Sequence, residues 1–96
     1  FCLRYKDDPG FILVGDLKTV SSKKAVTSRK PATAQLGAYA KMLELWHPNI
    51  RITECVTVVS GPDKCKVIRQ SPQDECIPAW DEAWGRFEAT QPKFDF

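Results

Sequence analysis

The hydrophobic residues at the start of the chain predict two strands joined by a turn. Residues 1–5 are mostly apolar, and residues 11–18 (FILVGDLK) are apolar on both faces as far as Val14. The segment 6–10 between them contains Asp, Pro and Gly, which favour a turn. A strand that is apolar on both faces is typical of a central strand with a layer packed on each side. We therefore expect residues 11–18 to lie inside a sheet that is covered on both faces.

The middle of the chain predicts a loop and then an amphipathic helix. Residues 19–33 have no regular apolar period and are rich in Ser, Thr and Lys, so we expect a long loop. Residues 34–46 form an apolar stripe, with Thr33 as the N-cap. Proline at position 48 stops this helix because it cannot continue the hydrogen-bond ladder.

The second half of the chain predicts a hairpin and a final helix. Residues 50–59 (IRITECVTVV) alternate and are β-branched, and residues 64–70 return after a turn that contains Gly and Pro. Residues 80–87 then show the i, i+3, i+4, i+7 period of a core-facing helix, which Pro92 ends. The residues that carry this period are Trp80, Ala83, Trp84 and Phe87. The expected order is β-β-α-β-β-α, an α/β or α+β fold with a mixed central sheet flanked by helices.

Length and composition indicate a single soluble domain. The chain has 96 residues, of which 43% are hydrophobic and 27% are charged. No apolar run approaches the roughly 20 residues that span a bilayer. We therefore expect an intracellular protein with no membrane partner. Because the chain begins at Phe1, inside a predicted strand, we interpret residues 1–96 as part of a larger domain that is truncated at its N-terminus.

The cysteines and the charge distribution narrow the classes of site. Cysteines occur at positions 2, 55, 65 and 76, a spacing unlike that of zinc or iron–sulfur sites. We expect reduced, mostly buried thiols, with neither zinc nor an iron–sulfur cluster. The net charge is only +2, but the segment 18–30 contains five cations and no acid. This basic loop either contacts nucleic-acid phosphates or is simply solvated. Its candidate DNA-binding residues are Lys23, Lys24, Arg29 and Lys30.

Asp16 and Lys18 are the first candidates for chemistry. They lie two positions apart on a predicted strand, so their side chains leave the same face, near the end of the strand. A carboxylate beside an amine suits metal-assisted phosphodiester hydrolysis. Asp16 would hold Mg²⁺ or Mn²⁺ together with the backbone carbonyl of Leu17, and Lys18 would orient the attacking water or stabilise charge on the phosphate. A simple ion pair at a strand end is the alternative.

Gln35 and Tyr39 are the second pair of candidates. At i and i+4 they share one helix face near the N-terminus of the predicted helix. Both side chains can hydrogen-bond a phosphate, and a helix N-terminus attracts anions. A capping glutamine and a core tyrosine are the alternative interpretation.

Taken together, these two pairs resemble a known family. The segments GDLKT (15–19) and QLGAY (35–39) resemble, in order and context, the DxKT and QxxxY motifs of RecB-like PD-(D/E)xK nucleases, in the phage-type or mitochondrial-type exonuclease branch. The resemblance covers residues 11–70. It implies a restriction-endonuclease-like core and a metal-dependent DNA nuclease, an exonuclease acting in DNA recombination or repair. Asp16, Lys18, Gln35 and Tyr39 would be its catalytic residues, and DNA its partner.

The chain also departs from the family pattern. The family uses a further acid on the preceding strand, and residues 1–5 offer none. We infer that this acid precedes Phe1, so that the chain is the C-terminal catalytic part of a larger nuclease domain and is inactive alone. The alternative is a catalytically inactive module of the same fold that binds DNA or serves in assembly. A homo-oligomer and a recombination or single-strand-binding partner both stay open.

Overall fold

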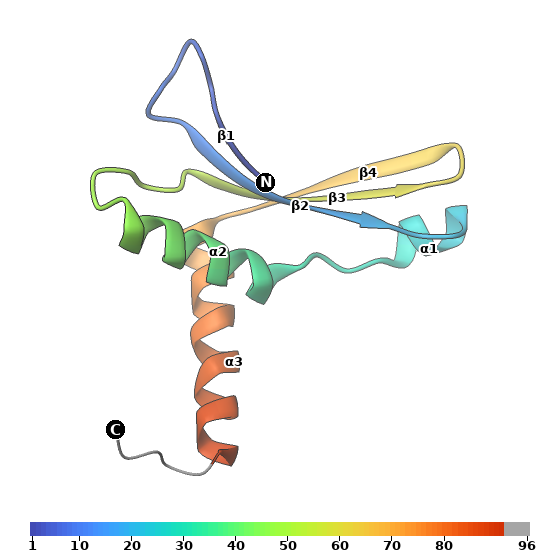
Figure 1. Ribbon diagram of the computed structural model, residues 1–96. Helices are drawn as coiled ribbons and strands as arrows, with labels where there is room; N and C mark the ends of the chain where they lie inside the picture. The colour runs from blue at the N-terminus through green and yellow to red at the C-terminus, as the bar shows by residue number, and fades with distance from the viewer. Residues whose placement is uncertain (92–96) are drawn as a thin grey trace.

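Four strands form one mixed sheet in the order β1-β2-β3-β4 in the computed structural model, which describes residues 1–91 (Figure 1). β1 (Cys2–Arg4) is antiparallel to β2 (Ile12–Thr19), β2 is parallel to β3 (Glu54–Gly61), and β3 is antiparallel to β4 (Lys64–Gln70). With its helices, the chain has an α+β fold in the order β-β-α-α-β-β-α.

The helices lie on one side of this sheet, which we call the inner face. α1 (Lys23–Ser28) and α2 (Thr33–Trp46) occupy the parallel crossover between β2 and β3. After β4, one π-helical turn, η1 (Pro72–Cys76), leads into α3 (Ile77–Thr90), which extends away from the sheet (Figure 1).

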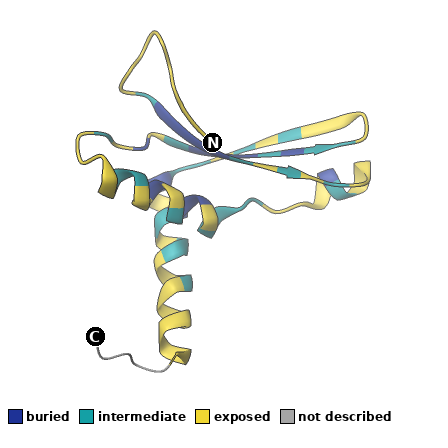
Figure 2. Cartoon of the chain, in the orientation of Figure 1, coloured by how far each residue is buried: buried dark blue, intermediate teal, exposed yellow. Residues whose placement is uncertain are grey.

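The core lies between α2 and the inner face. Leu36 and Ala40 of α2 are fully buried and pack against Ile12 and Val14 of β2, together with residues of the segment that leads into β3 and of η1. These two α2 residues belong to the apolar stripe expected from the sequence. Figure 2 shows the buried residues concentrated along the first half of β2, along β3 and at the start of α2.

The outer face of the sheet is covered by no helix of residues 1–91, so the expectation of a strand covered on both faces is wrong for the described chain (Figure 1). Leu3, Leu17 and Val67 are exposed there. Part of this face is shielded locally, because the ring of Phe1 lies where a Cβ on Gly15 would otherwise point. The first half of β2 is therefore buried against α2 on the inner face, and no second layer of helices covers its outer face within residues 1–91.

The segment 19–33 is not the continuous loop that its composition suggests, because α1 forms within it. Ser22 caps this helix by accepting a hydrogen bond from the backbone N–H of Ala25 at 3.1 Å, and Val26 is its one buried residue. A helix of six residues with one apolar contact leaves no period for sequence analysis to detect. The N-cap of α2 is Ala32 and not Thr33, whose hydroxyl instead bonds Gln70.

The third strand starts at Glu54, four residues later than expected. Thr53 explains the difference, because it joins β2 through irregular hydrogen bonds. Its hydroxyl accepts from the N–H of Ile12 at 3.2 Å, and its own N–H donates to the carbonyl of Ile12 at 2.8 Å. The return strand at 64–70 is confirmed.

α3 contradicts the expected core-facing helix, because none of its residues is buried. Its aromatic side chains pack on one another: the Trp80 and Trp84 rings stack at 5.7 Å, and the Trp84 and Phe87 rings at 5.5 Å. Trp84 and Phe87 are 45% and 52% exposed. The helix ends at Thr90, and the expected stop at Pro92 lies outside the described residues.

All four cysteines are free, but only two of them are buried. Cys55 and Cys76 lie in the core, whereas Cys2 and Cys65 are exposed, so the expectation of mostly buried thiols is half right. A hydrogen bond with Cys76, and then burial, raise the pKa of the Cys55 thiol and keep it neutral. Within residues 1–91 the structure contains no helix with the length and hydropathy needed to cross a bilayer.

Candidate functional site

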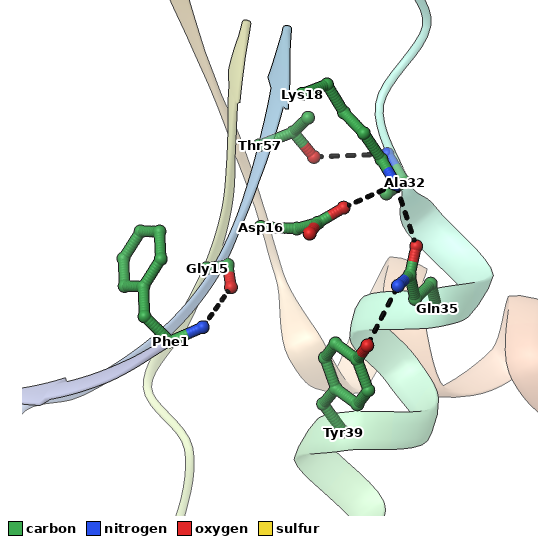
Figure 3. Close-up of polar contacts among 8 residues, drawn as sticks. All are labelled: Phe1, Gly15, Asp16, Lys18, Ala32, Gln35, Tyr39 and Thr57. Atoms are coloured by element: carbon green, nitrogen blue, oxygen red, sulfur yellow. Dashed lines mark hydrogen bonds and ion pairs between the residues drawn. The ribbon is translucent and has the colours of Figure 1, made fainter.

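Asp16 and Lys18 project from the inner face near the carboxyl end of β2. The parallel crossover brings the first turns of α2 over this end of the strand, so Gln35 and Tyr39 face them across a short gap (Figure 3). Thr57 of β3 lies opposite Asp16 in the strand register and accepts a hydrogen bond from the backbone N–H of Ala32 at 3.1 Å. This bond fixes the start of α2 against the sheet beside Asp16.

The four predicted catalytic side chains form one continuous polar chain. Lys18 Nζ lies 2.9 Å from Asp16 Oδ2 and donates to Gln35 Oε1 at 3.2 Å. Gln35 Nε2 donates in turn to the Tyr39 hydroxyl oxygen at 2.8 Å (Figure 3). The chain therefore runs from the sheet to the second turn of α2, and it joins the two sequence motifs through direct contacts.

The carboxylate of Asp16 is only partly satisfied. Its side chain is 17% exposed, and that of Lys18 is 28% exposed. Asp16 Oδ2 is buried and accepts no hydrogen bond with good geometry from residues 1–91. The ammonium of Lys18 is close to this oxygen, but it contributes positive charge and not a well-directed hydrogen bond. A buried anionic oxygen in this state is costly, and further positive charge would stabilise it.

The backbone carbonyl of Leu17 is a second oxygen available at this position. Gly15 exchanges hydrogen bonds with Phe1, at 2.8 Å and 2.7 Å, on the side of β2 that faces β1. Backbone groups two residues apart on a strand point the same way, so the carbonyl of Leu17 also faces the β1 side. Leu17 lies two residues beyond Gly15, outside the described β1–β2 pairing.

These oxygens suit a hard, hydrated cation and not a fully enclosed metal site. In residues 1–91 no group of three or more His, Cys, Asp or Glu side chains could hold a metal ion. Mg²⁺ often keeps several waters and binds through one or two carboxylates together with substrate phosphates. One carboxylate and one carbonyl fit that pattern, with weak affinity until a phosphate contributes further oxygens.

The predicted DNA-binding residues lie at the same end of the sheet. Lys23 and Lys24 belong to α1, Arg29 and Lys30 follow it, and all four are exposed. Arg29 and Lys30 help to line a hollow of about 540 Å³ next to α1. The segment that composition alone described as a basic loop is therefore a helix followed by an extended stretch, both anchored on the inner face.

Sequence analysis missed three residues that belong to this region. In the sequence Thr57 is one residue of an alternating strand, and nothing local marks it as an anchor for α2. Lys64 and Lys66 are predicted only to lie in a hairpin. Their ammonium groups bond Thr27 of α1, the first to its hydroxyl at 2.6 Å and the second to its carbonyl at 2.8 Å. Their i, i+2 spacing was the available signal, because it places both side chains on one face.

An apolar hollow adjoins the polar chain on its other side. It has a volume of about 330 Å³ and lies between α2 and the start of the β1–β2 hairpin. Its lining includes Tyr39, Met42 and Val14. Tyr39 therefore faces both the polar chain and an apolar space of a size that suits a flat organic ring.

Comparisons of the chain with protein-family models, with curated proteins and with solved structures found no match. Its function is therefore inferred from the side chains that meet at the rim of the sheet.

Proposed function

We propose that this chain is the catalytic part of a metal-dependent DNA nuclease of the RecB-like PD-(D/E)xK type, and that it acts as an exonuclease. The observation that carries the proposal is the contact chain from Asp16 through Lys18 and Gln35 to Tyr39. A chance occurrence of the letters GDLKT and QLGAY would not require these side chains to meet. The arrangement of β2, α2 and β3 around them is also consistent with the restriction-endonuclease-like core that the motifs imply.

Asp16 and the carbonyl of Leu17 would hold Mg²⁺ or Mn²⁺. When bound, the cation supplies positive charge to the scissile phosphodiester and to the attacking water. The buried and poorly satisfied Oδ2 of Asp16 supports this role, because the cation would replace the imperfect contact with Lys18. Weak affinity in the absence of DNA follows from the small number of protein oxygens.

Lys18 would then stabilise charge that develops on the phosphate. In the structure its ammonium lies between Asp16 and Gln35, and a lysine carries three N–H donors. Gln35 keeps the ammonium near the rim by accepting one of them. The hydroxyl oxygen of Tyr39 accepts from Gln35, so its own proton is free to point toward a phosphate oxygen. The apolar hollow beside Tyr39 would take the base or sugar of the terminal nucleotide.

The register of β1 on β2 indicates where a second carboxylate would complete the site. Phe1 lies opposite Gly15, so a residue joined to its amino group would continue the ladder opposite Asp16 and project from the same face. We expect an aspartate added there to strengthen Mn²⁺ binding about tenfold or more, because a second anionic oxygen replaces water in the shell. Isothermal titration measures the effect. An added asparagine is the matched control, and equal affinities for the two extensions would contradict this placement.

The test of the proposed function is hydrolysis of end-labelled linear DNA by the intact protein, including the segment expected before Phe1, with Mg²⁺ or Mn²⁺. We expect Asp16→Asn and Lys18→Met each to slow hydrolysis by about 100-fold or more, since each removes a charge that acts on the phosphate. Asp7→Asn, in the turn after β1, is the matched control and should leave the rate unchanged. Covalently closed circular DNA should resist an exonuclease. Unchanged rates for the Asp16 and Lys18 variants would refute the proposal.

The second candidate is a non-catalytic module of the same fold that binds DNA or serves in assembly. The observation that favours it is the 2.9 Å contact of Lys18 with Asp16, which resembles a permanent ion pair. In such a module, Mn²⁺ would show no binding that depends on Asp16, and neither extension of Phe1 would change the titration. Retained DNA binding without Asp16-dependent metal binding would favour this candidate over the nuclease.

A further inference from the structure

We propose that Lys64 and Lys66, on the β3–β4 hairpin, join α1 in a surface that binds the phosphate backbone of DNA. The proposal rests on the proposed function only in naming DNA as the ligand. The surface includes the loop cations expected from the sequence, and the hairpin extends it by adding a second element. Its cations are Lys23, Lys24, Arg29, Lys30, Lys64 and Lys66.

Strand register connects the hairpin to the candidate site. Lys18 of β2 pairs with Val59 of β3, and Val59 pairs with Lys66 of β4, so all three lie in one row across the sheet. Residues in one row project from the same face, which makes Lys66 an inner-face residue like Asp16 and Lys18. Strands are about 4.8 Å apart, which puts the backbones of Lys18 and Lys66 about 10 Å from each other. A DNA backbone that passes Lys18 can therefore also reach the hairpin.

Thr27 holds the two lysines in place. Lys64 Nζ donates to its hydroxyl at 2.6 Å, and Lys66 Nζ donates to its carbonyl at 2.8 Å. Each ammonium has three donors, so two remain for other acceptors after the bond to Thr27. Side chains that are already fixed lose less conformational entropy when a ligand binds.

The charge around this surface is strongly one-sided. The segments 17–31 and 62–70 contain a single acid, Asp63, in the hairpin turn. The acids of η1 and α3 lie on the part of the chain that leads away from the sheet (Figure 1). The surface therefore attracts polyanions with little local compensation.

Capping of α1 is the purely structural explanation for these lysines. Lys66 does contact a carbonyl in the last turn of that helix, and a cation there is favourable. Capping needs one ammonium, however, and Lys64 instead binds a side-chain hydroxyl. The extra charge is better explained by an anionic ligand.

DNA fits this surface better than an anionic membrane does. Segments that bind membranes combine cations with exposed apolar side chains that enter the bilayer. The apolar residue of α1, Val26, is buried, and no large hydrophobic side chain is exposed in the described segment 18–31.

The test is binding of fluorescently labelled linear DNA, measured by anisotropy in EDTA so that no hydrolysis occurs. We expect Lys64→Gln/Lys66→Gln, which keeps a hydrogen-bond donor for Thr27 but removes both charges, to weaken binding about fivefold or more. The slope of log affinity against log salt should become shallower by about 2, because each lysine that no longer neutralises a phosphate reduces it by about one unit. Lys6→Ala/Arg51→Ala removes two charges that precede β2 and β3, at the other end of those strands, and should change affinity less than about twofold.

A charge-preserving variant separates charge from folding. Lys64→Arg/Lys66→Arg should bind DNA within about twofold of the wild type, since the cations are retained. Wild-type affinity in the folded glutamine variant would overturn the inference, and so would equal losses in the glutamine and arginine variants. Binding to phosphatidylserine vesicles that needs the two lysines, together with lysine-independent DNA binding, would assign the surface to a membrane instead.

The same variants separate this inference from the proposed function. If the intact wild-type protein and its Asp16→Asn variant both fail to cleave DNA but bind it through Lys64 and Lys66, the nuclease assignment fails and the surface stands. If DNA is cleaved in an Asp16-dependent way but binds independently of both lysines, only the surface is refuted.

Discussion

At the scale of single residues, the ammonium of Lys18 contacts both Asp16 and Gln35, and these contacts depend on where α2 lies on the sheet. The i, i+2 spacing of Asp16 and Lys18 is enough to place both on one face of a strand. That Gln35 reaches Lys18 could not be read from spacing, because it depends on the length of the crossover and on where α2 lands on the sheet. Thr57 fixes that landing point, and its role depends wholly on a non-local contact.

The first prediction therefore concerns Thr57. This residue is fully buried, and its hydroxyl accepts the backbone N–H of Ala32 at the start of α2. Thr57→Val keeps the shape but leaves that N–H without its partner, so we expect the free energy of unfolding to fall by about 1–3 kcal/mol. Urea denaturation measures the change. Thr57→Ser keeps the acceptor and should cost less. A valine variant as stable as the wild type would show that this hydrogen bond does not anchor α2.

At the scale of elements, the apolar period predicted the two long helices, α2 and α3, but not which elements pack against them. The apolar stripe of α2 is buried as expected, whereas the similar stripe of α3 has no fully buried residue, and its Trp84 and Phe87 are exposed and stack on one another. A helical period shows that one face of the helix is apolar, but it does not show whether another element packs against that face. α1 was missed for the opposite reason, because its six residues are too few to show a period.

Two glycines in these helices give a matched prediction. A Cβ on Gly37 of α2 would collide with the backbone carbonyl group of Cys76, whereas a Cβ on Gly85 of α3 meets nothing within 4 Å. We expect Gly37→Ala to destabilise the protein by about 1–3 kcal/mol or more, because η1 must move away from α2. Gly85→Ala should stabilise the protein by up to about 1 kcal/mol through the better helix propensity of alanine. Thermal melts of the two variants compare the effects, and shifts of the same sign would contradict this packing.

At the scale of the whole molecule, the predicted α+β class and mixed sheet are confirmed, and the layer arrangement is not. The sequence indicated helices on both sides of the sheet, but the described helices lie on one side only. On the outer face the ring of Phe1 lies over Gly15, while Leu3, Leu17 and Val67 stay exposed. In the sequence the segment 18–30 is basic, whereas the segment 74–88 contains five acids. The fold then adds the hairpin lysines to the basic end.

The most direct test of the account is where Mn²⁺ binds in the folded protein. The ion broadens nearby signals in a ¹H–¹⁵N correlation spectrum, so even weak binding can be located. We predict that the backbone signals of Asp16, Leu17 and Lys18 broaden first, and that Asp16→Asn abolishes this selectivity while the spectrum stays folded. Broadening confined to other acids, such as those of η1 and α3, or unchanged by Asp16→Asn, would contradict a cation site at the rim of β2.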